Sequence, residues 1–305
     1  MTEAINAATL QESTSISNRA MKFRLSRGGT AKRVRDKDAE ALVKQQLGDE
    51  GQIVSRELFS DKGNLVYQYQ AKGNEMYTYH IKATLPYGDN GDRLLPNAAY
   101  FDYTTKMGGY ISVQDNLKVQ ILAQWPTLVQ TDINVRNARL IAQGKSPTAK
   151  VEDYPTVEQM DHRLYVNWFP EPVSTSGDFR FSLPPEMLAK VDEQLSLMVA
   201  EAGKDLYVRM LHPVTAFIGK LNKYTGDKGQ RWYDSFVDNL NALSKELPQL
   251  NVNDDPQVTT MLAEIDAIIK PYAFQPDALK EDEFARKQVK ERLEALEATL
   301  KGYAL

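Results

Sequence analysis

The chain has 305 residues, of which 37 are Lys or Arg, 41 are Asp or Glu, 3 are His and none is Cys. The length suits about two domains, and 42% hydrophobic residues are ample for a core. The lack of Cys excludes disulfides, thiolate nucleophiles and Cys-ligated zinc or iron–sulfur centres. No apolar run approaches the roughly 20 residues of a membrane helix, and residues 1–18 lack the features of a secretory signal. We therefore expect a cytoplasmic protein.

The charge is unevenly distributed along the chain. Residues 1–150 carry 20 basic and 15 acidic side chains, whereas residues 151–305 carry 17 and 26. A short basic segment, residues 19–37, holds eight cations and one acidic side chain. Within it, residues 22–27 alternate between apolar and polar, which predicts a half-buried strand.

The elements expected along the chain are mostly helices. In chain order we first expect a helix over 38–47, then either a broken helix or a hairpin over 65–83, interrupted at Gly73, and a turn at 86–92. A helix over 97–125, weak at Gly108 and Gly109, should follow, and then a helix over 127–143. Beyond it, residues 163–169 and 179–183 are β-like. The clearest pattern is an amphipathic helix over 188–224, which Pro213 should kink or split. Three further helices should follow, over about 232–247, 256–269 and 284–300.

These patterns predict an α+β fold that is predominantly α-helical, with a small mixed N-terminal part and a C-terminal helical bundle. We expect a flexible tail and basic arm (1–38), a mixed helical N-terminal domain (39–145), a linker with a β-hairpin-like patch (146–183) and a helical C-terminal domain (184–305). The sequence shows no internal repeat.

No residue pattern points to catalysis, a metal or a cofactor. The three histidines have no partner at metal-ligand spacing, and the Gly144-Lys145-Ser146 tripeptide lacks the glycine and the strand of a phosphate-binding loop. Asp89 and Asp92 flank a glycine as in a calcium loop, but the closing Glu is missing, which favours a tight turn. We expect a protein that is not an enzyme.

The basic segment is the candidate nucleic-acid site, because clustered cations bind phosphates without reading sequence. Its candidate contacts are Arg19, Lys22, Arg24, Arg27, Lys32, Arg33, Arg35 and Lys37. Phe23 and tyrosines further along the chain could stack on bases. Two alternatives remain: the segment docks on an acidic surface of a partner or of the C-terminal half, or it has no specific role.

The long amphipathic helix is a candidate interface between copies of the chain or with a protein partner. Its candidate contacts are Leu188, Val191, Leu195, Met198, Leu206 and Met210. The alternative is that this apolar face belongs to the chain's own core.

Several segments together resemble an uncharacterised protein family of tailed bacteriophages. They include residues 84–89, 93–96, 153–155, 177–180, 231–240 and 247–256, so that the resemblance covers about residues 84–256. It implies a phage accessory protein of the host cytoplasm, with an AAA+ ATPase as one possible partner, but no catalytic residues. Its polar residues suggest a shared surface made of Asp89, Asp92, Arg93, Asp178 and Arg180.

The sequence therefore gives one leading hypothesis and two alternatives. The first is a non-enzymatic accessory protein in phage DNA metabolism or host takeover that self-assembles or binds a protein partner. The second is a nucleic-acid-binding protein that uses the basic arm from Arg19 to Lys37. The third is an enzyme with an unrecognised carboxylate site.

Overall fold

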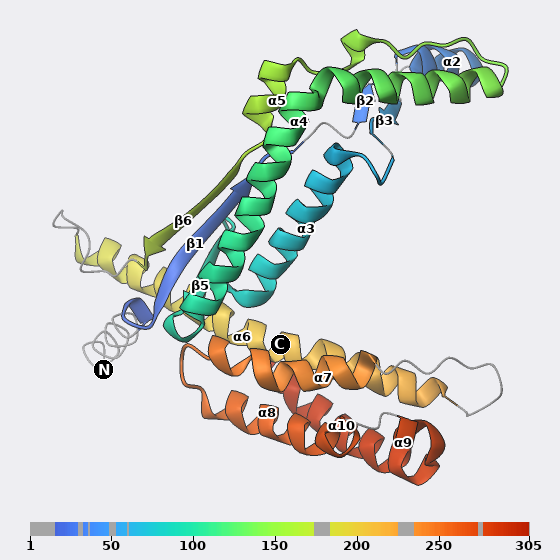
Figure 1. Ribbon diagram of the computed structural model, residues 1–305. Coiled ribbons are helices and arrows are strands. Elements are labelled where there is room, and N and C mark those ends of the chain that lie inside the picture. The colour runs from blue at the N-terminus through green and yellow to red at the C-terminus, as the bar shows by residue number, and fades with distance from the viewer. Residues whose placement is uncertain are drawn as a thin grey trace. The chain divides into compact units, whose positions relative to one another are not determined.

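The computed structural model describes residues 16–29, 33–35, 37–48, 53–59, 61–173, 184–224, 235–273 and 277–304. It confirms an α+β fold that is predominantly helical, with a small sheet and a helical C-terminal region (Figure 1). The chain divides into two compact units. Unit 1 comprises Met1–Arg24, Ile81–Tyr103 and Phe169–Leu305, and unit 2 comprises Leu25–His80 and Thr104–Trp168.

The four-stranded sheet contains β1 (Ala20–Arg27), β4 (Leu85–Pro86), β5 (Asp92–Pro96) and β6 (Val166–Pro172) in the order β4-β5-β1-β6. The predicted strand in the basic segment is thus confirmed as β1. Strand β1 pairs antiparallel with β5, so that Arg24 lies opposite Asp92. The expected turn joins β4 to β5, and Gly88 and Gly91 in it have φ values of 70° and 75°, which favour glycine.

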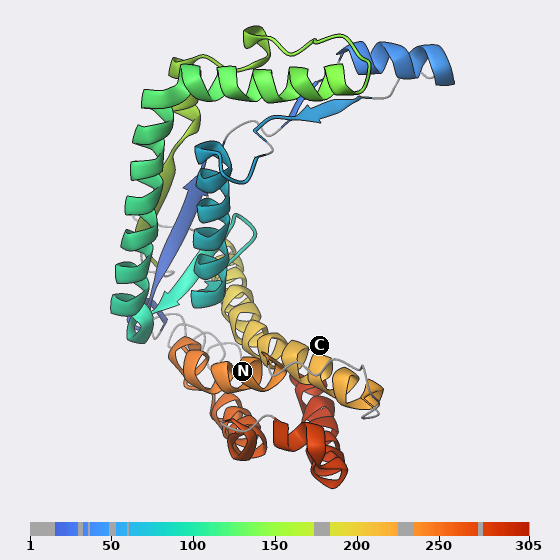
Figure 2. The same ribbon diagram turned by 45° about the vertical axis from the view of Figure 1, so that its right-hand side comes forward.

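Unit 1 is built around the long helix α6 (Pro185–Lys223). Helices α7 (Ser235–Glu246), α8 (Pro256–Ile269) and α10 (Glu283–Ala304) lie along it, and the short α9 (Asp277–Glu281) precedes α10 (Figures 1 and 2). The core contains Met210, Val214 and Phe217 of α6, all fully buried. Pro213 lies between these residues and α6 continues through it, so the expected split is wrong. Packing on both sides of Pro213 compensates for the one backbone hydrogen bond that proline removes.

Unit 2 contains most of helices α3 (Leu65–Ala83) and α4 (Tyr100–Ala142), which run alongside each other (Figures 1 and 2). It also contains α2 (Lys37–Leu47), α5 (Val157–Arg163) and the two-stranded pair β2 (Arg33–Arg35) and β3 (Ser55–Glu57). Its core includes Ile121, Trp125 and Met160. The indole N–H of Trp125 also donates to the Pro155 carbonyl at 2.9 Å, which fixes the segment before α5.

The expected breaks at glycines are absent, because α3 is continuous through Gly73 and α4 through Gly108 and Gly109. Helix α4 does not end at Pro126 either, but it bends sharply about halfway along its length (Figures 1 and 2). A glycine or a proline weakens a helix by about 1 or about 3 kcal/mol, respectively, which buried packing in the adjoining turns offsets. The β-like segment is β6, slightly later than expected, whereas residues 179–183 lie outside the described residues.

Candidate anion-binding site

The first three cations of the basic segment are paired with carboxylates inside unit 1. Arg19 donates to Asp254 at 2.5 Å, and Arg24 Nε donates to Asp92 Oδ1 at 2.7 Å. Lys22 lies between two carboxylates, 3.2 Å from Asp92 and 2.7 Å from Glu171. Asp254 and Glu171 belong to the acidic C-terminal half, so these pairs favour the self-docking alternative for this part of the segment.

The Asp92 carboxylate is the centre of this ion-pair network and is 8% exposed. Burial by itself would raise its pKa, but the hydrogen bonds from Arg24 and Lys22 outweigh burial and lower the pKa below the usual range. The contribution of Asp92 to folding stability is therefore present above the pKa of a carboxyl in the unfolded chain. It is lost as the pH falls through the lower pKa of the folded state.

We expect Asp92→Asn to flatten the acid side of the stability profile. Between neutral pH and pH ~3, the free energy of unfolding of the variant should fall less than that of the wild type. The control is Asp161→Asn. Lys118 lowers the pKa of Asp161 as well, but the Asp161 side chain is 53% exposed, whereas Asp92 is buried. Urea unfolding at a series of pH values measures both. If Asp92→Asn matches the wild-type profile, this account of the network is wrong.

Other members of the predicted set lie in unit 2. Arg35 donates from Nε to both carboxylate oxygens of Glu40, at 2.8 and 2.9 Å. Lys32 lies outside the described residues, and the side chains of Arg33 and Lys37 are likewise not described. Phe23 was expected as a base-stacking residue, but it is fully buried against Tyr103, which rules out contact with a ligand.

Arg27, at the end of β1, differs from these cations because it lines a pocket. Its Nη2 donates to Asn74 Oδ1 at 2.8 Å, and its guanidinium carbon lies 5.3 Å from the centre of the Tyr77 ring. Among the residues that the structure describes, Arg27 contacts no carboxylate. It therefore retains an unneutralised charge next to a ring that is 44% exposed.

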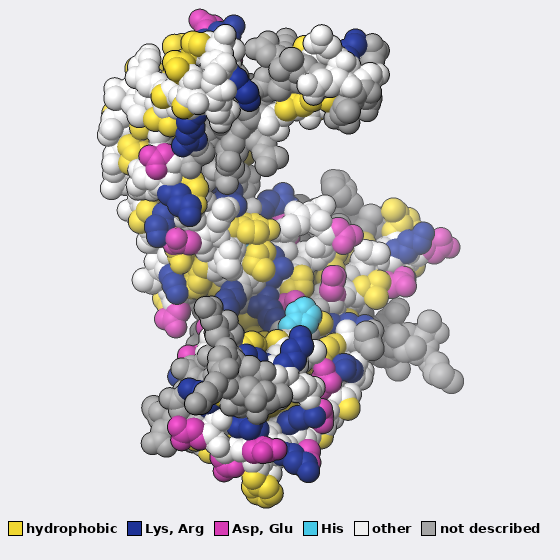
Figure 3. Space-filling model, turned by 90° about the vertical axis from the view of Figure 1, so that its right-hand side faces the viewer, with side chains coloured by type: hydrophobic (Ala, Val, Ile, Leu, Met, Phe, Trp, Pro, Cys, Tyr) yellow, Lys and Arg dark blue, Asp and Glu magenta, His cyan; other side chains and the backbone are white. Residues whose placement is uncertain are grey.

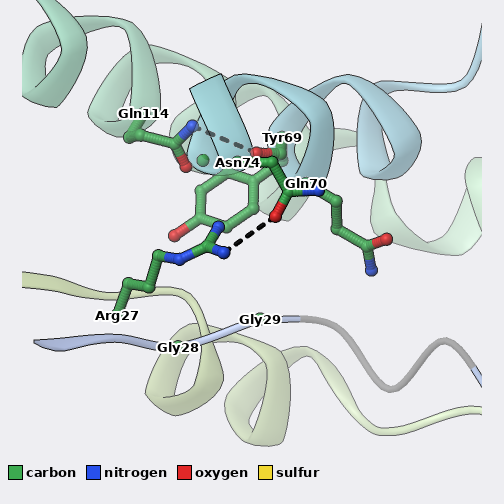
Figure 4. A pocket seen from close by; sticks show the side chains of 8 residues that line it. Arg27, Gly28, Gly29, Tyr69, Gln70, Asn74 and Gln114 are labelled. Carbon is green, nitrogen blue, oxygen red and sulfur yellow. Dashed lines mark hydrogen bonds between the residues drawn. The ribbon is translucent and has the colours of Figure 1, made fainter. Parts of the chain in front are cut away.

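The pocket has a volume of about 260 Å³ and lies within unit 2. Figure 4 shows the Arg27 side chain reaching from the end of β1 toward α3, with Tyr69 and Asn74 above it and Gly28 and Gly29 below. Its lining residues are Arg27, Gly28, Gly29, Tyr69, Gln70, Gly73, Asn74 and Gln114. None of these described residues is acidic, so the pocket is suited to an anion.

Glycines set the shape of this pocket. A Cβ on Gly73 would lie 2.7 Å from Nη1 of Arg27, so the absence of a side chain there leaves room for the guanidinium. A Cβ on Gly28 would lie 1.9 Å from the Arg163 carbonyl oxygen, which only glycine avoids. Gly28 also donates its N–H to the Tyr165 carbonyl at 2.9 Å, which anchors the segment after β1.

Tyr69 supplies a second polar group to the pocket. Its side chain is 3% exposed, and burial raises the pKa of its hydroxyl to about 12. The hydroxyl is therefore protonated at neutral pH and can donate a hydrogen bond. The Gln114 side chain donates to the Tyr69 carbonyl at 3.0 Å, which holds α3 and α4 together at this point.

Of the residues that line the pocket, Arg27 was predicted from the sequence, whereas Tyr69, Gln70, Asn74 and Gln114 were not. A signal was present in α3, because residues 70, 73, 74 and 77 share the three- and four-residue spacing of one helix face. That face combines amides, a glycine and a tyrosine, which differs from an ordinary apolar stripe. Its neighbour Gln114 is 45 residues from Tyr69, and no local pattern connects them.

The expected polar surface of the resemblance is only partly described. Asp89 is exposed, Asp92 belongs to the ion-pair network, and Asp178 and Arg180 lie outside the described residues. Arg93 donates to the Ile81 and Thr84 carbonyls at 3.0 and 2.7 Å. Asp92 and Arg93 therefore hold unit 1 together.

The expected interface residues divide into two groups. Leu195, Leu206 and Met210 are buried, whereas Leu188, Val191 and Met198 are half-buried. Leu206 and Met210 belong to the chain's own core, which favours the core alternative for that part of α6. Over the C-terminal helices, the face in Figure 3 shows basic and acidic side chains interspersed.

Three comparisons with known proteins gave no relative. No family model, no curated protein and no solved structure matches the chain. The described residues contain no group of three or more His, Asp or Glu side chains placed to hold a metal ion. A search of the same residues for a helix long and apolar enough to cross a membrane finds none.

Proposed function

We propose that this protein is a non-enzymatic accessory protein that binds single-stranded nucleic acid at the Arg27 pocket. The observation that carries the proposal is the unneutralised guanidinium of Arg27, held in a pocket beside the exposed ring of Tyr77. A guanidinium binds phosphate through paired hydrogen bonds, and an exposed aromatic ring stacks on an unpaired base. The bases of a duplex are not available for such stacking, which favours a single strand.

The other cations of the basic segment whose side chains the structure describes support a small contact rather than a long one. Arg19, Lys22, Arg24 and Arg35 are already paired with carboxylates. Assembly through α6, the leading hypothesis from the sequence, has less support because Leu206 and Met210 are core residues. Together with the resemblance to a tailed-phage family, these observations make phage DNA metabolism the setting that we propose.

The test is fluorescence anisotropy with labelled single- and double-stranded DNA at low and moderate salt. We expect Arg27→Gln to weaken binding of the single strand by about tenfold, the effect of losing one charge-assisted contact. The matched control is Arg35→Gln, which removes the same charge from the same segment but from a side chain paired with Glu40. It should change the affinity less than about twofold.

Point variants are needed because deleting residues 1–38 would remove β1, an inner strand of the sheet. The salt dependence gives an independent reading. Each phosphate contact with a single strand contributes about −0.7 to the slope of log affinity against log salt concentration. We therefore expect a slope of about −0.7, the value for a single contact. Equal affinities of the wild type and Arg27→Gln, or no binding at low salt, would overturn the proposal.

A further inference from the structure

The groups that face the Arg27 pocket come from three elements and are suited to one compact anion. Arg27 reaches in from β1, Tyr69 from α3 and Gln114 from α4 (Figure 4). Arg27 is the only cation among the described lining residues. The volume of about 260 Å³ is large enough for a phosphate group and leaves room beside it.

The Tyr69 hydroxyl is the most informative group in the pocket. Tyr69 as a residue is 3% exposed, and its hydroxyl makes no hydrogen bond to a residue that the structure describes. The hydroxyl oxygen is not among the fully buried atoms that lack a partner, so it is open to the pocket and can donate to a bound anion. Arg27 and Tyr69 line the same pocket, and Figure 4 shows the Tyr69 ring next to the Arg27 guanidinium. The charges of Asp115 and Arg27 act on the Tyr69 hydroxyl in opposite directions: Asp115 raises its pKa and Arg27 lowers it.

We propose that the pocket binds the terminal phosphate monoester of a nucleic-acid strand, with the adjoining nucleoside toward Tyr77. A phosphodiester within a strand has two free oxygens and one negative charge, whereas a monoester has three oxygens and a charge of about −1.5 to −2. Donors that approach from separate elements match the three oxygens of a monoester. A strand that continued in both directions would have to leave the pocket on two sides.

This inference rests on the proposed function, because it names the part of the strand that the same site binds. The probes are three single-stranded oligonucleotides of one sequence: 5′-phosphorylated, 3′-phosphorylated and unphosphorylated, each labelled away from the tested end. We expect one phosphorylated form to bind the full-length protein about tenfold more tightly than the unphosphorylated form. A nucleoside monophosphate serves as the competitor that distinguishes a strand end from a free nucleotide.

Two variants test the pocket groups separately. Tyr69→Phe removes only the hydroxyl and should reduce the preference for the phosphorylated end to about twofold, with the affinity for the unphosphorylated strand unchanged. Arg27→Lys keeps the charge but not the planar pair of donors, and should also reduce the preference. Arg35→Gln should keep the full preference, because that side chain is paired with Glu40. Circular dichroism establishes that each variant is folded.

The outcomes separate the two proposals. If all three oligonucleotides bind equally and Arg27→Gln weakens them all, the end-binding inference is wrong and the proposed function stands. If no oligonucleotide binds, both are wrong. If the nucleoside monophosphate binds as tightly as the phosphorylated strand, the ligand is a free nucleotide, which overturns the strand-end assignment. A phosphate preference that Tyr69→Phe leaves intact would place the phosphate elsewhere and overturn the inference.

Discussion

Phe23→Ala is expected to lower the free energy of unfolding by about 3–5 kcal/mol, because it removes a fully buried aromatic ring from the sheet. The Phe23 ring lies edge-on to Tyr103, with centroids 5.2 Å apart, and that contact is lost as well. Urea unfolding followed by circular dichroism measures the change. A folded variant of wild-type stability that loses DNA affinity would instead make Phe23 a base-stacking residue.

The control for this prediction is Phe23→Leu. Leucine keeps an apolar side chain in the same buried place, so the loss should be below about 1.5 kcal/mol if the surroundings repack. For a core position, we expect the free energy of unfolding to decrease in the order Phe, Leu, Ala at residue 23. If Leu and Ala destabilise equally, the loss comes from the aromatic contact with Tyr103 rather than from the volume of the side chain.

Arg209→Met is expected to destabilise unit 1 by about 2–4 kcal/mol, since it leaves backbone carbonyls and one carboxylate without a partner. The Arg209 guanidinium donates to the Ile81, Lys82 and Thr84 carbonyls at 2.6–2.9 Å, and to Asp205 at 2.7 Å. These carbonyls lie at the end of α3, where a helix has carbonyls without an intrahelical partner. Differential scanning calorimetry and urea unfolding measure the loss.

Arg93 makes this prediction more specific. Arg93 donates to the same Ile81 and Thr84 carbonyls, so these carbonyls keep one hydrogen-bond donor when either arginine is replaced. The double variant Arg93→Met with Arg209→Met should therefore lose more stability than the sum of the single losses. Arg209→Lys retains the charge without the planar donors and should recover only part of the loss. An Arg209→Met protein within about 0.5 kcal/mol of wild type would contradict this role.

The elements could be predicted from the sequence where the apolar spacing is regular. The residues Leu206, Met210, Val214 and Phe217 indicated α6, and the alternation around Phe23 indicated β1. The expected breaks at Gly73 and Pro213 are wrong because local helix propensity is weaker than the burial on either side. Helix α4 is one helix through Pro126, but it bends sharply about halfway along (Figure 2). The sequence of one helix does not show how much of its surface the neighbouring elements will bury.

The site was only partly predictable for a different reason. The basic segment was visible, but the sequence does not show which of its cations are already paired. Arg24 meets Asp92 across 68 residues, and Arg19 meets Asp254 across 235. Only the fold brings these carboxylates to the segment and leaves Arg27 in a pocket. Tyr69 was not identified for a similar reason, because the sequence does not show that this side chain lines a pocket.

The two compact units are connected within regular elements rather than through linkers. The chain passes from one unit to the other inside β1, α3, α4 and β6. In genetic terms, neither unit corresponds to an uninterrupted stretch of the coding sequence. A gene fragment or a terminal deletion therefore encodes an incomplete core, and recombination cannot transfer one unit to another protein as a cassette. The roles of the two units have to be separated by substituting single residues in the whole chain.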